Sequence, residues 1–345
     1  MSGWMEVVQP GLGATLQDRG RIGHRHQGVP WAGCLDGPLA EAANALVDNH
    51  HGEAVLELRG MGPELRVHAG PVRLALVGQI TAWRCTAEGR RSPVPAWETA
   101  TLQTGDTLQL GGAESGCAYL AVAGGWRVEP QLGSRSSHGR TGLTGVLGRA
   151  LQAGDLLPCR IWPAASEPEH RMPTAWRQPD GPIRVVLGPQ QDHFTPEALS
   201  VFLEQEWTAT AAQDRMGLRL SGTPLAHTRP AAADIVSDAV APGAIQVPAN
   251  GLPIVLLADS QTVGGYPKIA TVISADLPRL AHLKPGTRLR FQAVSGAEAR
   301  QALQDQRTAW TRWLATREAF VPPGFIDEAA LYGDNLISGM LRADP

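Results

Sequence analysis

The sequence of 345 residues is poor in lysine and in cysteine. Of its 30 Lys and Arg residues, only Lys268 and Lys284 are lysines, so arginine fills almost every cationic position. The four cysteines contain no Cys-x-x-Cys pair and lie far apart in the chain, at Cys34, Cys85, Cys117 and Cys159. This spacing argues against a zinc site built on cysteines and gives no support to a disulfide framework.

A strong net charge and a long apolar run are also missing. The formal net charge is −3, which gives no general attraction to nucleic acid. No apolar run approaches the roughly 20 residues that a membrane span needs. The first residues, Met-Ser-Gly-Trp-Met-Glu, lack the basic start and apolar core of a signal peptide. We therefore expect a soluble, cytoplasmic protein with no nucleic-acid or membrane partner.

Several catalytic and cofactor motifs are absent. Neither lysine follows a glycine, so there is no Gly-x4-Gly-Lys phosphate loop, and neither follows a methionine, so the usual biotin-acceptor sequence is missing. There is no Gly-x-Ser-x-Gly elbow and no His-Glu-x-x-His. ATP or biotin would have to be bound by shape or delivered by another chain, which points to a subunit of a complex.

What is abundant is glycine and proline, with 39 and 27 residues, and this composition favours many turns and short strands. Between residues 54 and 123 no helical pattern interrupts the strand candidates, which predicts an antiparallel, barrel-like domain. Glu57 alternates with apolar neighbours there, and we expect it to face solvent. The candidate strands are 54–58, 72–77, 99–102, 107–110 and 117–123.

The pattern divides the chain into two strand-rich domains. Prolines punctuate residues 161–182, which we interpret as an extended linker between a domain at 1–160 and a second at 183–294. Ser295-Gly-Ala-Glu298 is a capping box that begins a helix to about residue 320 within a C-terminal segment, 295–345. Asp36 is expected to cap an earlier helix, followed by Pro38 in its first turn.

The stretch most suggestive of chemistry is Gln261-Thr-Val-Gly-Gly-Tyr-Pro-Lys268, called here the GGYPK loop. It lies between two short apolar runs of strand length, 254–258 and 269–273. Gly264 and Gly265 could form a nest of backbone N–H groups for an anion, with Tyr266 and Lys268 beside it. A glycine-rich hairpin with an exposed lysine is the structural alternative.

Other loops carry further candidates. Asp192 and His193 could manage protons after strand 183–187, although adjacent side chains often point apart, and Gln190 lies in the same loop. Arg135, in a Gly-Ser-Arg-Ser loop, and Arg215, before a strand, could each bind a carboxylate or phosphate. A surface loop is the alternative for Arg135 and a salt bridge for Arg215.

The loop 17–30 holds His24 and His26 at a spacing that a metal could use. The neighbouring cations Arg19, Arg21 and Arg25 would repel a divalent ion, so no metal site is predicted. Packing over one end of a barrel is the expected role, with anion contact by an arginine as the functional alternative.

Six motifs in order resemble the allophanate hydrolase subunit 2 / biotin-dependent carboxyltransferase-like family, over roughly residues 5 to 292. They are Gln9-Pro-Gly-Leu, Gln17-Asp-Arg-Gly, Gly188-Pro-Gln-Gln-Asp-His-Phe194, Asp214-Arg-Met-Gly217, Pro242-Gly-Ala-Ile-Gln-Val-Pro248 and the GGYPK loop with its following strand. The resemblance implies a mainly β fold with a few helices, built as two tandem cyclophilin-like β-barrel domains.

Two activities in that family set the functional expectation. The first is the ATP-dependent opening of 5-oxo-L-proline to L-glutamate by a 5-oxoprolinase, in which this chain would be the C subunit, working with the A and B subunits, with ATP and Mg²⁺ bound in the complex. The second is carboxyl transfer from carboxybiotin to urea or a similar amide. A regulatory role, binding a kinase inhibitor that resembles the B subunit, is a third alternative. For either enzymatic activity, the catalytic candidates are Lys268, Tyr266, Asp192 and His193. The anion-binding or substrate-binding candidates are Gly264, Gly265, Arg215, Arg135, Gln190 and Asp36.

Overall fold

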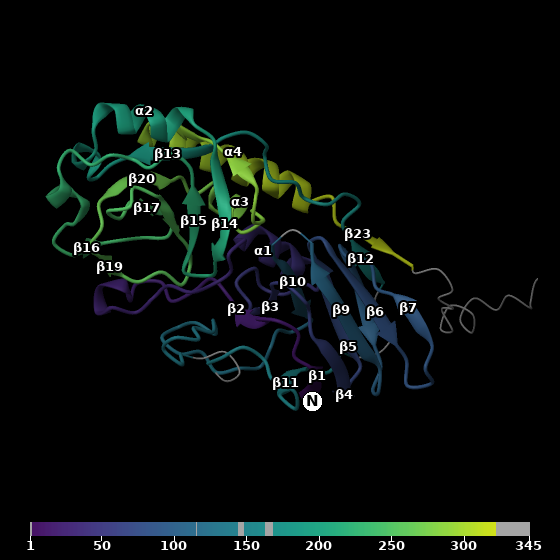
Figure 1. Ribbon diagram of the computed structural model, residues 1–345. Coiled ribbons are helices and arrows are strands. Elements are labelled where there is room, and N and C mark those ends of the chain that lie inside the picture. The colour runs from purple at the N-terminus through teal and green to yellow at the C-terminus, as the bar shows by residue number, and fades with distance from the viewer. Residues whose placement is uncertain (1, 115, 144–147, 163–167, 322–345) are drawn as a thin grey trace, which may run out of the picture.

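The computed structural model describes residues 2–114, 116–143, 148–162 and 168–321. It contains a first half, residues 2–160, and a second half, residues 183–294, each built mainly of strands (Figure 1). Helix α1 (Gly37–Leu46) lies between the halves. The predicted division at 161–182 and the predicted C-terminal segment stay predictions, and residues 163–167 and 322–345 lie outside the described part.

The first half is formed by two sheets that face each other across one apolar core. Its core joins Leu65 and Leu108 of one sheet to Leu56, Leu74 and Leu120 of the other, all nearly inaccessible to solvent. The first sheet has the order β11-β1-β4-β9-β6-β7, with β1 Ser2–Gln9, β4 Glu64–Ala69, β6 Ile80–Cys85, β7 Arg91–Pro93, β9 Thr107–Ala113 and β11 Leu156–Arg160. The second has the order β2-β3-β10-β5-β8-β12-β23, with β2 Thr15–Gln17, β3 Val55–Leu58, β5 Val72–Val77, β8 Glu98–Leu102, β10 Ala118–Val122, β12 Glu169–Arg171 and β23 Glu318–Phe320.

Helix α1 explains why β3, β5 and β10 are buried on both faces. Asp36 caps the helix by accepting a hydrogen bond from the Leu39 amide at 3.0 Å, as predicted. The apolar side of the helix packs on the outer face of these three strands, which burial of apolar side chains stabilises. The prediction that Glu57 faces solvent is wrong, because α1 and the second half cover that face and leave Glu57 0% exposed.

The second half is a nearly closed barrel. Its sheet has the order β21-β14-β15-β18-β17-β20-β13-β22, and the two edge strands, β21 (Arg288–Leu289) and β22 (Phe291–Ala293), are separated by one residue. That short connection brings the two edges of the sheet together. The other strands are β13 Ile183–Leu187, β14 Trp207–Gln213, β15 Gly217–Ser221, β17 Ala244–Gln246, β18 Ile254–Leu256 and β20 Lys268–Val272. Helices α2 (Pro196–Glu204) and α3 (Leu277–Leu280) and a two-stranded ribbon, β16 (Asp238–Ala239) with β19 (Val263–Gly264), complete it.

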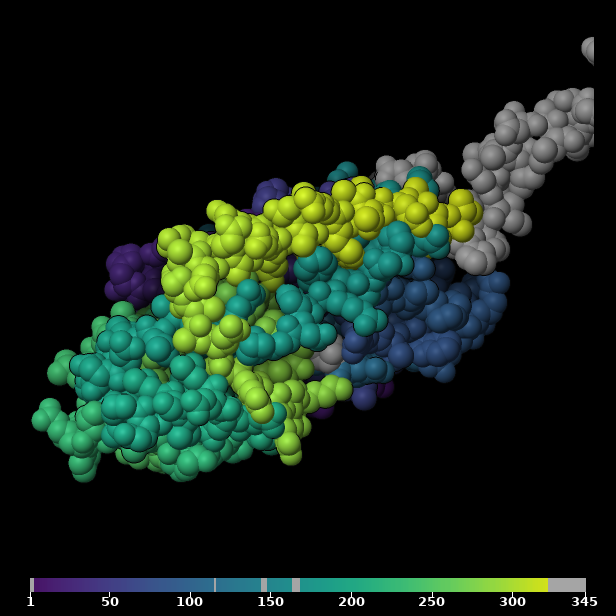
Figure 2. Space-filling model, turned by 90° about the horizontal axis from the view of Figure 1, so that it is seen from above, coloured from purple at the N-terminus to yellow at the C-terminus, as the bar shows by residue number. Residues whose placement is uncertain are grey.

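Helix α4 (Gly296–Leu314) runs from the second half back to the first (Figure 2). It begins with the predicted Ser295–Glu298 capping box and ends six residues earlier than the predicted residue 320. Trp310 packs edge-on against Trp176 with ring centroids 5.0 Å apart, so the aromatic face docks on the chain itself. The chain then forms β23, which pairs with β12 inside the segment predicted to be a linker.

The predicted fold class, mainly β with a few helices and two tandem barrel-like units, is confirmed. The hairpin alternative for the GGYPK loop is wrong. Strands β18 and β20 lie on either side of β17 in the sheet and do not pair with each other. The loop therefore crosses one end of β17 and does not join two neighbouring strands.

Candidate functional site

A cavity of about 700 Å³ lies where the two halves meet. Its walls come from the loop 18–35 and α1 of the first half, and from residues 241–242, 257–258 and 271–278 of the second half. One stripe of α4 closes a further side, through Leu303, Gln306, Arg307 and Trp310. A concave site of this volume between two folded units is the usual setting for a small-molecule ligand.

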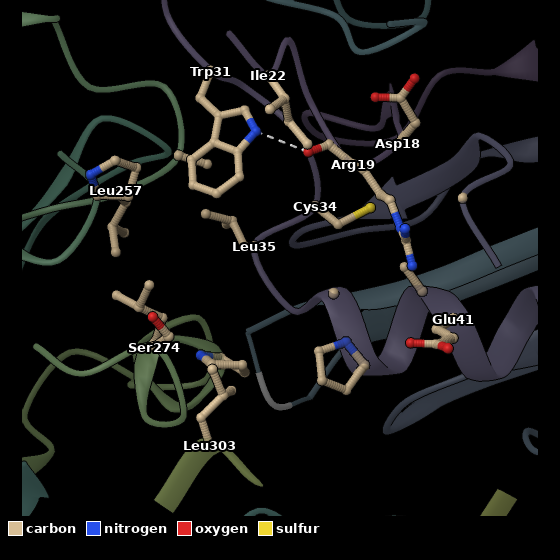
Figure 3. A pocket seen from close by; sticks show the side chains of 18 of the residues that line it. Asp18, Arg19, Ile22, Trp31, Cys34, Leu35, Glu41, Leu257, Ser274 and Leu303 are labelled. Carbon is tan, nitrogen blue, oxygen red and sulfur yellow. Dashed lines mark hydrogen bonds between the residues drawn. The ribbon is translucent and has the colours of Figure 1, made fainter. Parts of the chain in front are cut away.

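The walls of this inter-half cavity are largely apolar. Trp31, Leu35 and Leu257 lie around its upper part, with Leu303 below them (Figure 3). The Trp31 indole donates to the Arg19 carbonyl at 2.9 Å, which fixes the base of the Arg19 side chain at the edge of the cavity. Polar groups in such surroundings act with a lower effective dielectric than in water.

Asp18 organises one edge of the cavity. Its Oδ1 accepts hydrogen bonds from the hydroxyls of Ser134 and Ser136, both at 2.6 Å, and Oδ2 accepts one from the Arg135 amide at 2.6 Å. The Arg135 guanidinium donates to the Val128 carbonyl at 2.7 Å and pairs with Glu53 at 3.6 Å. The Gly-Ser-Arg-Ser loop is thus held to the Gln-Asp-Arg motif, and Arg135 already has partners in the chain.

Arg215 lies behind the cavity wall and joins the halves. Its guanidinium bonds both oxygens of Asp259, at 2.8 and 3.0 Å, and also the Glu57 carboxylate and the Gly33 carbonyl. Although burial opposes the charged form, the Glu57 and Asp259 carboxylates raise the pKa of Arg215. Sequence reasoning proposed that Arg215 binds substrate; the structure instead occupies each of its nitrogens with an oxygen of the chain.

Cys34 lines the cavity but is not activated as a nucleophile. Burial, with the nearby Glu57 carboxylate, raises the pKa of the Cys34 thiol well above its usual range. A thiol in that state stays protonated near neutral pH, and the thiolate is the nucleophilic form. All four cysteines are free.

Two of the predicted residues, Lys268 and Gln190, form a cluster with Asp238 at the other end of β20. The Lys268 ammonium is 4% exposed and donates to Asp238 at 2.6 Å and to the Ala239 carbonyl at 2.8 Å. Gln190 accepts from the Lys268 amide at 3.1 Å and donates to Asp238 at 3.2 Å. These bonds hold the ribbon strand β16 against β20, and the bond from Lys268 lowers the pKa of Asp238.

The anion nest at Gly264 and Gly265 stays a prediction. Gly264 pairs with Asp238 in the β16–β19 ribbon, and the Gly265 carbonyl accepts from the Ile235 amide at 2.8 Å. Neither glycine has a positive φ. A Cβ at Gly264 would lie 2.4 Å from Nε2 of the buried Gln246, so the end of that side chain would have to move.

The remaining loop candidates do not converge on one point. His193 bonds the Ala232 carbonyl through Nδ1 at 2.8 Å, while Asp192 is exposed, and no bond joins the two side chains among the described residues. Tyr266 is 41% exposed. Arg25 reaches from the first half to the carbonyls of Val240 and Gln261, at 2.7 and 2.8 Å, so loop 17–30 packs on the GGYPK loop.

Asp36 lies in a second, smaller cavity of about 510 Å³ on the far side of α1. Its carboxylate is 0% exposed and accepts a hydrogen bond from His282 of the second half at 2.8 Å. Burial opposes the imidazolium, but hydrogen bonds to Asp36 and the Cys117 thiol outweigh it and raise the pKa of His282 to about 11. Asp36 therefore caps a helix and pairs with a cation, which leaves little of it for an outside anion.

Sequence reasoning missed the unpaired charges around the inter-half cavity. Arg19, Glu41 and Arg307 all line it, and in the described part of the chain none of the three makes an ion pair or a side-chain hydrogen bond. Arg19 was one of three neighbouring cations for which anion contact was given as the functional alternative. Nothing in the sequence could place Arg307 there, since the course of α4 across both halves had to be known first.

Fold and site together define a protein of two tandem β-barrel-like units with a ligand-sized cavity between them. A family described as "Carboxyltransferase domain, subdomain A and B" matches residues 27–293. The chain belongs to this carboxyltransferase-domain family, which confirms the resemblance found in its motifs.

Relatives within the family have more than one function. The C subunit of the 5-oxoprolinase of Escherichia coli (strain K12) is 33% identical over 309 residues, which cover 88% of this chain and 95% of that protein. The urea amidolyase of Lachancea kluyveri is 30% identical over 330 residues, which cover 88% of this chain but 18% of that protein. The solved structure of Kluyveromyces lactis urea carboxylase matches 94% of this chain and 30% of its own, with a TM-score of 0.78 and 26% identity.

No helix in the part of the chain that the structure describes is both long enough and apolar enough to span a membrane.

Proposed function

We propose that this chain is the C subunit of a 5-oxoprolinase, and that 5-oxo-L-proline binds in the inter-half cavity. The observation that carries the proposal is the match to the C subunit of the Escherichia coli 5-oxoprolinase over 95% of that protein's length. The urea amidolyase match covers 18% of its relative, so the chain corresponds to a whole subunit of the first enzyme and to a minor part of the second.

The chemistry acts on an amide. The lactam C–N bond breaks, water adds its hydroxyl to the carbonyl carbon, and a proton goes to the nitrogen, which gives L-glutamate. Negative charge develops on the carbonyl oxygen during attack, so preorganised donors around that oxygen would speed the reaction. The apolar walls of the cavity would exclude bulk water from the substrate.

ATP and Mg²⁺ belong to the proposed complex and not to a site on this chain. The described residues contain no group of three or more His, Cys, Asp or Glu side chains that could hold a metal ion. The sequence also lacks a lysine-bearing phosphate loop. We propose that ATP with Mg²⁺ is bound in the assembled complex, and we assign no step on this chain to it.

The test is ATP-dependent release of glutamate from 5-oxoproline by the purified chain mixed with homologues of the A and B subunits. Leaving out each component in turn provides the controls. Release that stops when this chain is omitted supports the proposal. Release that continues without it contradicts the proposal, and tight binding to the B subunit without turnover favours the regulatory alternative.

Carboxyl transfer from carboxybiotin to urea or a similar amide is the second candidate function. It is favoured by the structural match to urea carboxylase over 94% of this chain. Biotin would arrive on another chain, because this one lacks the usual acceptor sequence. Urea-dependent loss of the carboxyl group from carboxybiotin, in the presence of this chain, would support this second function over the first.

A further inference from the structure

We infer that Arg19 and Arg307 select a carboxylate-bearing amide as the ligand of the inter-half cavity. The inference rests on the proposed function and deepens it, because it names the substrate class and the residues that recognise it. 5-Oxoproline carries a carboxylate, whereas urea is neutral, so this pair of arginines bears directly on the choice between the two candidate functions.

The first observation is that Arg19 and Arg307 line the cavity, are exposed to solvent, and have no ion-pair partner in the described part of the chain. Other arginines near the cavity are occupied: Arg135 contacts Glu53 at 3.6 Å, and Arg215 contacts Asp259 at 2.8 Å. Arginine is the side chain best suited to hold a carboxylate, because its planar fork can donate two parallel hydrogen bonds.

The second observation is where the two arginines are anchored. Arg19 comes from the first half, where the Trp31 indole donates a hydrogen bond to the Arg19 carbonyl. The Arg19 side chain passes close to Gly52, where an added Cβ would lie 3.5 Å from Arg19 Nε. Figure 3 shows this side chain running from its loop toward α1. Arg307 comes from α4, where its neighbours three and four residues away are not acidic, so no pairing along the helix competes for it.

The third observation is the balance of charge around the cavity. Asp18 is 8% exposed and already accepts from two hydroxyls and backbone amides, and Glu53 pairs with Arg135. Glu41 on α1 is the lining carboxylate left without such a partner among the described residues. Two unpaired cations against one unpaired carboxylate favour an anionic ligand, and Glu41 could accept the N–H of its amide.

The test is calorimetric titration of the full chain with 5-oxoproline, with its carboxamide, and with urea. We expect wild type to bind the acid at least about tenfold more tightly than the carboxamide, since each charge-assisted hydrogen bond is strong. Arg19→Gln and Arg307→Gln should each remove most of that preference. Arg312→Gln, on the same helix but outside the cavity, is the matched control and should leave it intact.

Equal binding of acid and carboxamide by wild type, no binding of the acid, or a preference that survives both variants would overturn the inference. Turnover in the presence of the A and B subunits separates this result from the proposed function. If no glutamate is released but the arginine-dependent preference for the acid is present, the proposed function fails and the inference stands. If wild type turns over and both variants keep its KM, the inference alone fails.

Discussion

Each nitrogen of Arg215 that carries hydrogen donates to an oxygen of the chain, and this residue shows how strongly a single side chain can tie the halves together. Glu57 and Gly33 belong to the first half and Asp259 to the second. Glu57 is buried on a strand and also accepts from the Tyr119 hydroxyl at 2.8 Å. Removing the arginine would leave a buried carboxylate without its cation.

We therefore expect Arg215→Met to lower the free energy of unfolding by about 3 to 5 kcal/mol, the usual effect of breaking a buried ion pair on one side. Denaturant unfolding followed by tryptophan fluorescence would measure it. Adding Glu57→Gln should recover part of the loss, and Arg219→Met, on the exposed face of β15, is the matched control. A decrease of less than about 1 kcal/mol in the free energy of unfolding is typical of a surface ion pair, and it would contradict the role of Arg215 as a buried link between the halves.

Lys268 tests the cluster at the start of β20. Its ammonium is nearly buried but its partner Asp238 is half exposed, so removing the lysine leaves the carboxylate in contact with water. We expect Lys268→Ala to lower the free energy of unfolding by about 2 to 3 kcal/mol, from two lost hydrogen bonds of a charged donor. Lys284→Ala, at the other lysine of the chain, should change it by less than about 0.5 kcal/mol. Equal effects would show that the cluster contributes nothing specific.

Among the elements, the β16–β19 ribbon packs Gly264 closely against the buried Gln246 side chain. A Cβ at Gly264 would lie 2.4 Å from Gln246 Nε2, whereas at Gly265 the nearest atom is the Ile235 carbonyl oxygen at 3.6 Å. We expect Gly264→Ala to lower the free energy of unfolding by about 1 kcal/mol, because the end of the buried Gln246 side chain would have to move. Gly265→Ala, one residue away, should be close to neutral. Thermal unfolding of the two variants side by side would decide, and the reverse order would contradict this packing.

How far the elements could be predicted depended on their sequence pattern. Strands 72–77 and 183–187 were predicted with their observed bounds because each is an apolar run, interrupted by a single arginine, between turn residues. Strand β4, Glu64–Ala69, was missed because charged residues alternate with its buried ones. The hairpin around the GGYPK loop was mistaken because the placement of β17 between β18 and β20 is a long-range pairing that local pattern does not encode.

At the scale of the whole molecule, the contact between halves carries a titrating group. The Asp36–His282 ion pair crosses that contact and raises the pKa of His282 to about 11. A raised folded-state pKa means that the folded chain binds the proton more tightly than the unfolded chain. The resulting stabilisation is complete below the unfolded pKa of about 6.5 and is lost as the pH rises toward 11.

We expect the free energy of unfolding of wild type to fall between pH 7 and pH 10, and the fall to be smaller in His282→Gln, which lacks the titrating group. His68→Gln, at an exposed position of β4, should follow wild type. Urea unfolding at several pH values would give the slopes. Identical slopes for wild type and His282→Gln would show that the ion pair between the halves does not have the strength assigned to it.

The candidate site could be predicted only in part, because it depends on contacts between residues far apart in the sequence. Motifs identified the loops that meet around the site, and the structure brings the Gln-Asp-Arg and Gly-Ser-Arg-Ser motifs together at Asp18. Which arginine stays unpaired depends on partners far away in the sequence. Arg215 meets Glu57 across 158 positions, whereas Arg307 meets no acidic residue within the described chain.

We propose that the inter-half cavity holds the amide substrate between Arg19 and Arg307. A crystal structure of the full chain, grown with the A and B subunits and soaked with 5-oxoproline, would show where the substrate binds. We expect density for the lactam in this cavity, with its carboxylate against at least one of the two arginines. Density at the GGYPK loop, or in the smaller cavity beside Asp36, with the inter-half cavity holding no ligand, would contradict it.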